Sequence, residues 1–244
     1  MSIKLKTLIQ KGKAKLTAQG DAALMITFGD SADMNPDPLA SARARYITQR
    51  ASKLMGLAAL DCNQSARAVM LCFDPLILDY PQLIKQLEAL DLPTDQQEQS
   101  KTINHHLVPL CYDWGEDWDA LCRHLNLSRD TLIKLHSKAQ YRVTMLGFMP
   151  GLPYLHGLDP ALAIPRLDTP RKNVRAGMVG ISGSMCVIYP APSPGGWNLI
   201  GRCPWRLFWS NPEPRARFTA GDSVSFSPIS RKEFEDIAQQ EGIM

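Results

Sequence analysis

Apolar positions in the first 98 residues switch between strand spacing and helix spacing. Residues 22–28 form a continuous apolar run behind the turn pair Gly20-Asp21, which predicts a β-hairpin over residues 13–28. The segment Asn35-Pro36-Asp37-Pro38 is a helix start signal. Apolar or alanine positions then continue on one helical face as far as Gly56. A hairpin followed by a helix is therefore expected.

Two strands and a second helix complete this half of the pattern. Short apolar runs predict strands at residues 57–60 and 68–73. Leucine and isoleucine at helical spacing predict a helix over residues 79–90, which ends before Pro93. Short strands alternating with helices in this way predict a small α+β domain of ferredoxin-like character over residues 1–98.

A polar segment separates this domain from the rest of the chain. Residues 99–104 suit a linker, and the second domain is expected over residues 105–244. It opens with a strand at 106–112, which Pro109 places at a sheet edge or bend. Two helices follow, over residues 116–125 and 128–136, and the Ser128 hydroxyl can cap the second.

From Tyr141 onward the pattern changes to short apolar runs broken every few residues by glycine or proline. These runs lie at residues 142–146, 178–182, 185–189, 205–208 and 224–228. Many short strands with dense turn residues predict a closed or nearly closed β-barrel. The chain as a whole is therefore expected to be α+β.

Charge and composition exclude several classes of function. The 27 basic and 24 acidic side chains are interleaved, and the most basic stretch, residues 4–15, has no aromatic residue. This argues against a nucleic-acid partner and favours a solvated basic arm at the N-terminus. No run approaches the roughly 18 apolar residues of a membrane span, and no signal peptide is evident. We expect a cytoplasmic protein that does not bind membranes.

The six cysteines and the histidines give no metal signature. No C-x-x-C pair occurs, so buried reduced thiols are favoured over metal or redox function. His105 and His106 are adjacent and point to opposite faces of a strand, so no metal site is predicted. His136 closes a predicted helix, whose C-terminus favours the protonated imidazole. It is either a helix-capping residue or a general base.

The segment 147–155 interleaves two glycines and two prolines with aromatic residues. Proline fixes φ and glycine opens backbone conformations closed to other residues, so such a loop has a fixed shape. Phe148, Gly151 and Tyr154 are thus candidates for a concave binding wall. The alternative is a structural corner of the barrel.

A second candidate lies at residues 193–202. The amides of Gly195 and Gly196, next to Trp197, suit an anion or oxyanion, although a plain turn into a strand is the alternative. Arg171 follows a rigid turn and can grip a carboxylate or phosphate, unless it is merely an exposed surface residue. The glycine spacing at 177–183 fits neither a dinucleotide fingerprint nor a P-loop, and the segment 180–184 misses G-x-S-x-G.

Taken in order, these motifs resemble the 5-oxoprolinase B-subunit family, also called KipI-like or allophanate hydrolase subunit 1. The resemblance covers residues 106–229 well and residues 20–75 loosely. It is carried by His136-Ser137, Tyr141, the segments 147–155, 170–171, 176–181 and 193–202, and Ala220-Gly221-Asp222. The resemblance implies a ferredoxin-like domain followed by a cyclophilin-like β-barrel.

The same resemblance implies an enzyme subunit that is inactive alone. With an A subunit and a carboxyltransferase-like C subunit it would open the cyclic amide 5-oxoproline to glutamate with ATP hydrolysis. ATP and Mg would act at the level of the complex, since no motif of this chain binds them. In this scheme His136 and Arg171 are catalytic candidates. The substrate would contact Phe148, Gly151, Tyr154, Gly195, Gly196 and Trp197. The alternative is a regulatory protein of the KipI type, which inhibits a sensor histidine kinase.

Three positions depart from the family pattern. Met185-Cys186 stands where members of the family have Gln-Thr, and Cys203 replaces a threonine. These changes remove hydrogen-bonding side chains that a small polar ligand would use. Either the substrate differs or these residues lie away from the site.

Overall fold

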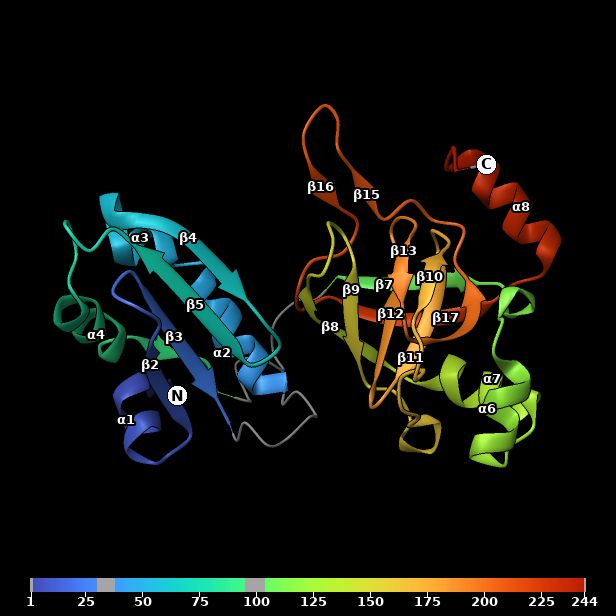
Figure 1. Ribbon diagram of the computed structural model, residues 1–244, viewed down its shortest axis with the longest axis horizontal. Coiled ribbons are helices and arrows are strands. Elements are labelled where there is room, and N and C mark those ends of the chain that lie inside the picture. Colours follow the sequence, from blue (N-terminus) through green and yellow to red (C-terminus); the bar gives the residue numbers. More distant parts are fainter. Residues whose placement is uncertain (1, 30–37, 95–103, 244) are drawn as a thin grey trace. The chain divides into compact units, whose positions relative to one another are not determined.

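The computed structural model describes residues 2–29, 38–94 and 104–243. The chain divides into two compact units, Met1–Thr102 and Ile103–Met244 (Figure 1). The predicted linker at 99–104 lies outside the described residues except for Asn104, as does the helix start signal at 35–37. Each unit has a core of its own and is described separately.

The first unit is built on a four-stranded antiparallel sheet in the order β2-β3-β5-β4. The strands are β2 (Ala14–Ala18), β3 (Ala23–Phe28), β4 (Ala59–Gln64) and β5 (Ala68–Phe73). The predicted hairpin is present, and Gly20 adopts a φ of +66° in its turn. Every second residue of β3 and β5 is buried, because alternate side chains of a strand point to opposite faces. One face of the sheet therefore carries the core.

Helices cover this buried face of the sheet. They are α2 (Pro38–Thr48), α3 (Ala51–Met55) and α4 (Tyr80–Glu88), with the 3₁₀ turn η1 (Gly56–Ala58). The single helix expected as far as Gly56 is divided at Gln49 and Arg50, where the Arg50 amide donates to the Ile47 carbonyl, three residues back, at 2.9 Å. Helix α4 forms as predicted, and the Asp79 carboxylate caps it by accepting from the Gln82 amide at 2.8 Å.

The N-terminal segment is not the solvated arm that its lysines suggest. Strand β1 (Ile3–Lys4) pairs with β6 (Asp91–Leu92), and helix α1 (Leu5–Gln10) buries Leu5 and Leu8 completely. The two leucines lie on one helical face while the lysines stay exposed. The segment is therefore an amphipathic helix, which its basic composition did not indicate.

The structure does not confirm the ferredoxin-like prediction for the first unit. In a β-α-β-β-α-β arrangement the last strand joins the main sheet. Here β6 pairs with β1 within the described part of the unit, and β2 lies beside β3 at that edge of the sheet. The hairpin partner of β3 therefore takes the edge position.

The second unit is a seven-stranded sheet that closes almost completely on itself, as predicted. The strand order is β14-β11-β12-β9-β8-β17-β7, with β7 parallel to β17 at one end. Just beyond β7, Cys111 forms two backbone hydrogen bonds of 3.0 Å with Arg202 of β14, the strand at the other end. These bonds join the two edges of the barrel. The strands are β7 (His105–Leu110), β8 (Tyr141–Leu146), β9 (Pro153–His156), β11 (Met178–Ser182), β12 (Met185–Ile188), β14 (Asn198–Arg202) and β17 (Ser223–Pro228).

The remaining elements of the second unit lie outside the seven-stranded sheet (Figure 1). Strand β9 lies within the segment predicted to be a loop, and the run predicted at 205–208 is only a two-residue strand, β15. Helices α6 and α7 match the two predicted helices, and Ser128 caps α7. These elements are η2 (Tyr112–Trp114), α6 (Trp118–Leu125), α7 (Arg129–Lys138), η3 (Pro160–Leu162), β10 (Arg171–Val174), β13 (Ser193–Gly195), β15 (Phe208–Trp209), β16 (Arg215–Ala216) and α8 (Arg231–Gln240).

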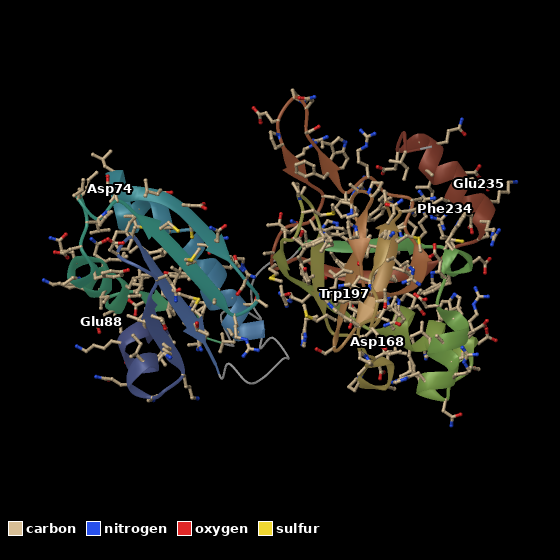
Figure 2. All side chains as sticks on the ribbon, in the orientation of Figure 1. Asp74, Glu88, Asp168, Trp197, Phe234 and Glu235 are labelled. Atoms are coloured by element: carbon tan, nitrogen blue, oxygen red, sulfur yellow. The ribbon has the colours of Figure 1, made fainter. Side chains whose placement is uncertain are left out.

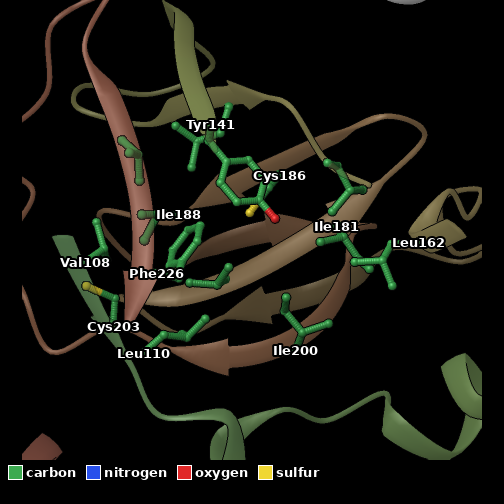
Figure 3. Packing of buried hydrophobic residues seen from close by; sticks show 14 of the residues in the cluster. Val108, Leu110, Tyr141, Leu162, Ile181, Cys186, Ile188, Ile200, Cys203 and Phe226 are labelled. Carbon is green, nitrogen blue, oxygen red and sulfur yellow. The ribbon is translucent and has the colours of Figure 1, made fainter. Parts of the chain in front are cut away.

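The interior of the barrel is a packed apolar core. Figure 3 shows Cys186 next to the Tyr141 ring, with Phe226 close by. Along β12, Cys186 and Ile188 belong to this interior, whereas Val187 belongs to a second cluster on the opposite side of the strand. The barrel wall is therefore apolar on both sides at β12.

His136 is buried inside this core. Its Nδ1 lies 2.7 Å from the Tyr112 hydroxyl and its Nε2 lies 3.6 Å from the Cys186 sulfur. Burial lowers the pKa of His136 to about 3, so desolvation outweighs the helix C-terminus that was expected to favour protonation. A neutral, buried histidine supports the structure, and the expected protonated cap is wrong.

The pH dependence of stability tests this burial. Because native His136 stays neutral while the unfolded chain takes up a proton below about pH 6.5, stability should fall as pH drops from about 6.5 toward 3. In His136→Gln this contribution, up to about 1.4 kcal/mol per pH unit, disappears. All five tryptophans lie in the second unit, so urea unfolding followed by tryptophan fluorescence at pH 7.5 and 4.5 measures it.

A histidine on the surface provides the control. His124 on α6 is exposed, and His124→Gln should keep the wild-type change of unfolding free energy with pH. Equal slopes for the wild type and His136→Gln would contradict the assignment of the lowered pKa.

Candidate functional site

A cavity of about 210 Å³ lies against the outer side of the barrel wall. Strands β9, β12 and β13 and the turn before β10 supply its lining. The lining residues are Phe148, Leu152, Tyr154, Arg166, Pro170, Val187, Tyr189, Pro194, Gly195, Gly196 and Trp197. Five of the eight predicted site residues meet here: Phe148, Tyr154, Gly195, Gly196 and Trp197.

The floor of the cavity is apolar and buried. Leu152, Val187, Tyr189 and Trp197 are all buried, and Figure 2 labels Trp197. The Tyr154 ring meets the Trp197 indole edge-on with centroids 6.1 Å apart. A Cβ on Gly180 of β11 would lie 2.7 Å from the Trp197 Cβ, so that glycine makes room for the indole.

The polar side chains among the described lining residues are one guanidinium and two phenols. Arg166 lies over the Trp197 indole, 5.3 Å from the ring centroid. Burial raises the pKa of Tyr189 to about 12, against a lowering by Arg166, and burial also raises the pKa of Tyr154. Both phenols therefore keep their protons at neutral pH and can donate hydrogen bonds.

The segment 147–155 contributes three separate side chains to the cavity, those of Phe148, Leu152 and Tyr154. Phe148 has a φ of +68° and its side chain is 69% exposed at the cavity rim. A bulky residue in the left-handed region is strained, and such strain clusters at binding sites. Gly151 does not line the cavity: with φ +81°, it packs against Phe208, where a Cβ would be 2.8 Å from the Phe208 Cβ.

The structure gives the paired glycines a packing role rather than the predicted role as an anion nest. Neither Gly195 nor Gly196 has a positive φ, so the pair lacks the left-handed residue typical of a nest. A Cβ on Gly195 would lie 2.3 Å from the Tyr189 hydroxyl, whereas a Cβ on Gly196 would meet nothing closer than 3.6 Å. Gly195 is thus required for the close approach of Tyr189.

Arg171 lies behind the cavity wall. Its guanidinium pairs with Asp117, lies 3.6 Å from Glu116, and donates to the Trp197 carbonyl at 3.4 Å. The other Asp117 oxygen accepts from the Leu199 amide at 2.6 Å. Arg171 therefore holds Trp197 in place. The expected role in gripping a substrate would require breaking this ion pair.

Arg166 and Tyr189 are the polar cavity residues that sequence reasoning missed. Arg166 and Arg171 flank the same proline-containing turn, and the sequence does not say which of the two faces a cavity. His136, the other catalytic candidate, lies inside the barrel and lines a small apolar void there instead.

The departures from the family pattern lie off the cavity. Cys186 and Cys203 are buried inside the barrel, where the Cys203 sulfur accepts from the Trp205 amide at 3.4 Å. Met185 points to the same side of β12 as Val187 and packs against the apolar floor without lining the cavity. All six cysteines are free thiols. The three changes therefore alter packing rather than the cavity lining.

The described residues were also compared with what a metal site and a membrane-spanning helix require. Within residues 2–29, 38–94 and 104–243, no three His, Cys, Asp or Glu side chains gather in a way that could hold a metal ion. None of the helices in those ranges combines the length and apolar character needed to cross a membrane.

The ion pair of Arg171 should carry much more stability than its surface neighbour. Arg171→Ala leaves the largely buried Asp117 carboxylate without its cation, so we expect a loss of about 3 kcal/mol. Arg175 pairs with Glu116 at 3.0 Å but is half exposed, and Arg175→Ala should cost less than about 1 kcal/mol. Urea unfolding followed by tryptophan fluorescence compares the two variants. Equal losses of unfolding free energy would contradict a structural role for the ion pair between Arg171 and Asp117.

The two glycines provide a second matched pair. Gly195→Ala forces the Tyr189 ring to move and should cost about 1–3 kcal/mol as overpacking. Gly196→Ala has room for its methyl group and should stay within about 0.5 kcal/mol of the wild type. Thermal unfolding measures both, and a tolerated Gly195→Ala would show that the Tyr189 contact is not tight.

Comparisons with known proteins agree over most of the chain. The family model for the carboxyltransferase domain, subdomains C and D, matches residues 14–218. The 5-oxoprolinase B subunit of Haemophilus influenzae is 37% identical over 157 residues, covering 63% of this chain and 72% of the relative. The crystal structure of TTHA0988 matches with a TM-score of 0.72 and 31% identity, over 85% of this chain but only 40% of that longer chain.

The relative from Bacillus subtilis extends the match to nearly full length. The 5-oxoprolinase B subunit of that organism is 32% identical over 226 residues, covering 88% of this chain and 92% of the relative. Since both the family model and this relative span most of the sequence, the chain belongs to the 5-oxoprolinase B-subunit family.

Proposed function

We propose that this chain is the B subunit of an ATP-dependent 5-oxoprolinase, which opens 5-oxoproline to glutamate together with A and C subunits. The match with the Bacillus subtilis relative over 92% of its length carries the proposal. The cavity beside Trp197 is then the part of the site that this chain contributes.

The lining of the cavity explains why such a chain would need partners. Among the described residues that line it there is no carboxylate, histidine, cysteine or lysine, and the two tyrosines keep their protons at neutral pH. A five-membered lactam is a stable amide that needs activation of its carbonyl oxygen, for instance by phosphorylation, before water can open it. The groups for that step, and for proton transfer, would come from the other subunits.

The cavity residues do not fit ATP or its magnesium ion. Magnesium prefers carboxylate and phosphate oxygens, and the described lining offers no acidic side chain. The volume of about 210 Å³ is also below the range of about 300–1,000 Å³ usual for drug-sized ligands. We therefore assign the nucleotide to the partner subunits and only a small substrate to this cavity.

Reconstitution tests the proposal. The chain, co-expressed with its A and C partners, should give glutamate from 5-oxoproline only when ATP is present, as measured by coupled glutamate detection. Omission of the chain should abolish the activity, and Gly195→Ala should reduce it, because the added methyl group displaces the Tyr189 ring. Full activity from the A and C partners alone would refute the assignment.

A further inference from the structure

Arg166 is the one cationic side chain among the described residues that line the cavity. The backbone on each side of it is anchored. The Pro165 carbonyl accepts from the buried Asn198 side-chain amide at 2.9 Å, and the Leu167 amide donates to the Gly196 carbonyl at 2.8 Å. Arg166 therefore extends from a turn that is tied to the same segment that carries Trp197. The residue itself is exposed, and the Trp197 ring is the side chain that its guanidinium lies against.

The guanidinium has no counter-ion within the part of the chain that the structure describes. Its face lies over the Trp197 indole, 5.3 Å from the centroid, and this leaves the planar edge of N–H donors available. The neighbouring Arg171 and Arg175 are, by contrast, paired with Asp117 and Glu116 outside the cavity. An unpaired arginine in a site without acids favours an anionic ligand.

The rest of the lining defines what such an anion can be attached to. Leu152, Val187 and Trp197 form an apolar floor that suits the carbon skeleton of a compact ring. The protonated phenols of Tyr154 and Tyr189 can donate to a second oxygen. The small volume excludes bulky groups. Cation, apolar floor and hydroxyl donors thus match a small cyclic monocarboxylate.

We propose that this cavity selects small ring carboxylates and that Arg166, rather than Arg171, binds the carboxylate group. The inference rests on the proposed function, because it names the group of 5-oxoproline that this subunit recognises. It makes Arg166 a residue that distinguishes the acid from a neutral amide of the same shape.

The test compares 5-oxoproline with its neutral carboxamide as substrates of the reconstituted complex. In Arg166→Met the KM for 5-oxoproline should rise about ten- to a hundredfold, the cost of losing hydrogen bonds to a charged group. The KM for the carboxamide should change little. The wild-type preference for the acid should therefore disappear, with kcat less affected than KM.

Two further variants act as controls. Arg166→Lys keeps the charge but not the planar pair of donors, so it should retain part of the preference for the acid. Arg175→Met removes an arginine that lies outside the cavity and should leave both KM values unchanged. Unaltered acid preference in Arg166→Met would overturn the proposal. An equal loss for both substrates would also overturn it, since Arg166 would then only support Trp197.

A binding experiment distinguishes failure of this inference from failure of the proposed function. Calorimetry measures binding of 5-oxoproline, its carboxamide and benzoate to the full chain alone. If the complex does not turn over 5-oxoproline but the chain binds the acids through Arg166, the carboxylate site stands and the proposed function fails. If turnover occurs without dependence on Arg166, the function stands and the carboxylate site fails. Absence of both turnover and acid binding contradicts both.

Discussion

The ion pair between Arg171 and Asp117 connects three segments that are far apart in the sequence. Asp117 precedes helix α6, Arg171 begins strand β10, and the second Asp117 oxygen binds the Leu199 amide of β14. Arg171 also donates to the Trp197 carbonyl. Because the indole of Trp197 forms one wall of the cavity and supports Arg166, the geometry of the site depends on a charge pair that does not itself line the cavity.

Local patterns were enough to predict most of the second unit. Turn residues, alternating apolar runs and the capping serine located the barrel strands and the helices α6 and α7, because these features depend on neighbours in the sequence. The Gly-Pro segments also marked the parts of the chain that line the cavity. Strand β9 was missed because Gly151 and Pro153 suggest a loop, although pairing with β8 and β12 imposes a strand.

Features that depend on distant residues could not be predicted. The choice between Arg166 and Arg171 is made by Asp117, which is 54 residues away from Arg171. The neutral state of His136 follows from burial among aromatic and thiol side chains that lie on other elements. In the first unit, the pairing of β6 with β1, which lies about 88 residues earlier in the chain, is likewise a contact between distant residues. Residue types indicated where chemistry was possible, and tertiary contacts determined which residues were free to perform it.

The exposed Phe148 at the rim of the cavity suggests a surface that another molecule covers. Phe148 holds a strained backbone conformation, which costs of order 1–3 kcal/mol, yet 69% of its side chain remains exposed. Burial within this chain offsets little of that cost. A ligand or a neighbouring subunit seated over the rim would bury the ring and also exclude water from a lactam bound below it. Such closure strengthens the interaction of Arg166 with a carboxylate, because an arginine that is exposed to solvent binds an anion weakly. In the proposed complex, the exposed Phe148 and the unpaired Arg166 thus have the same need. Both require another surface over the cavity before the site can select a carboxylate.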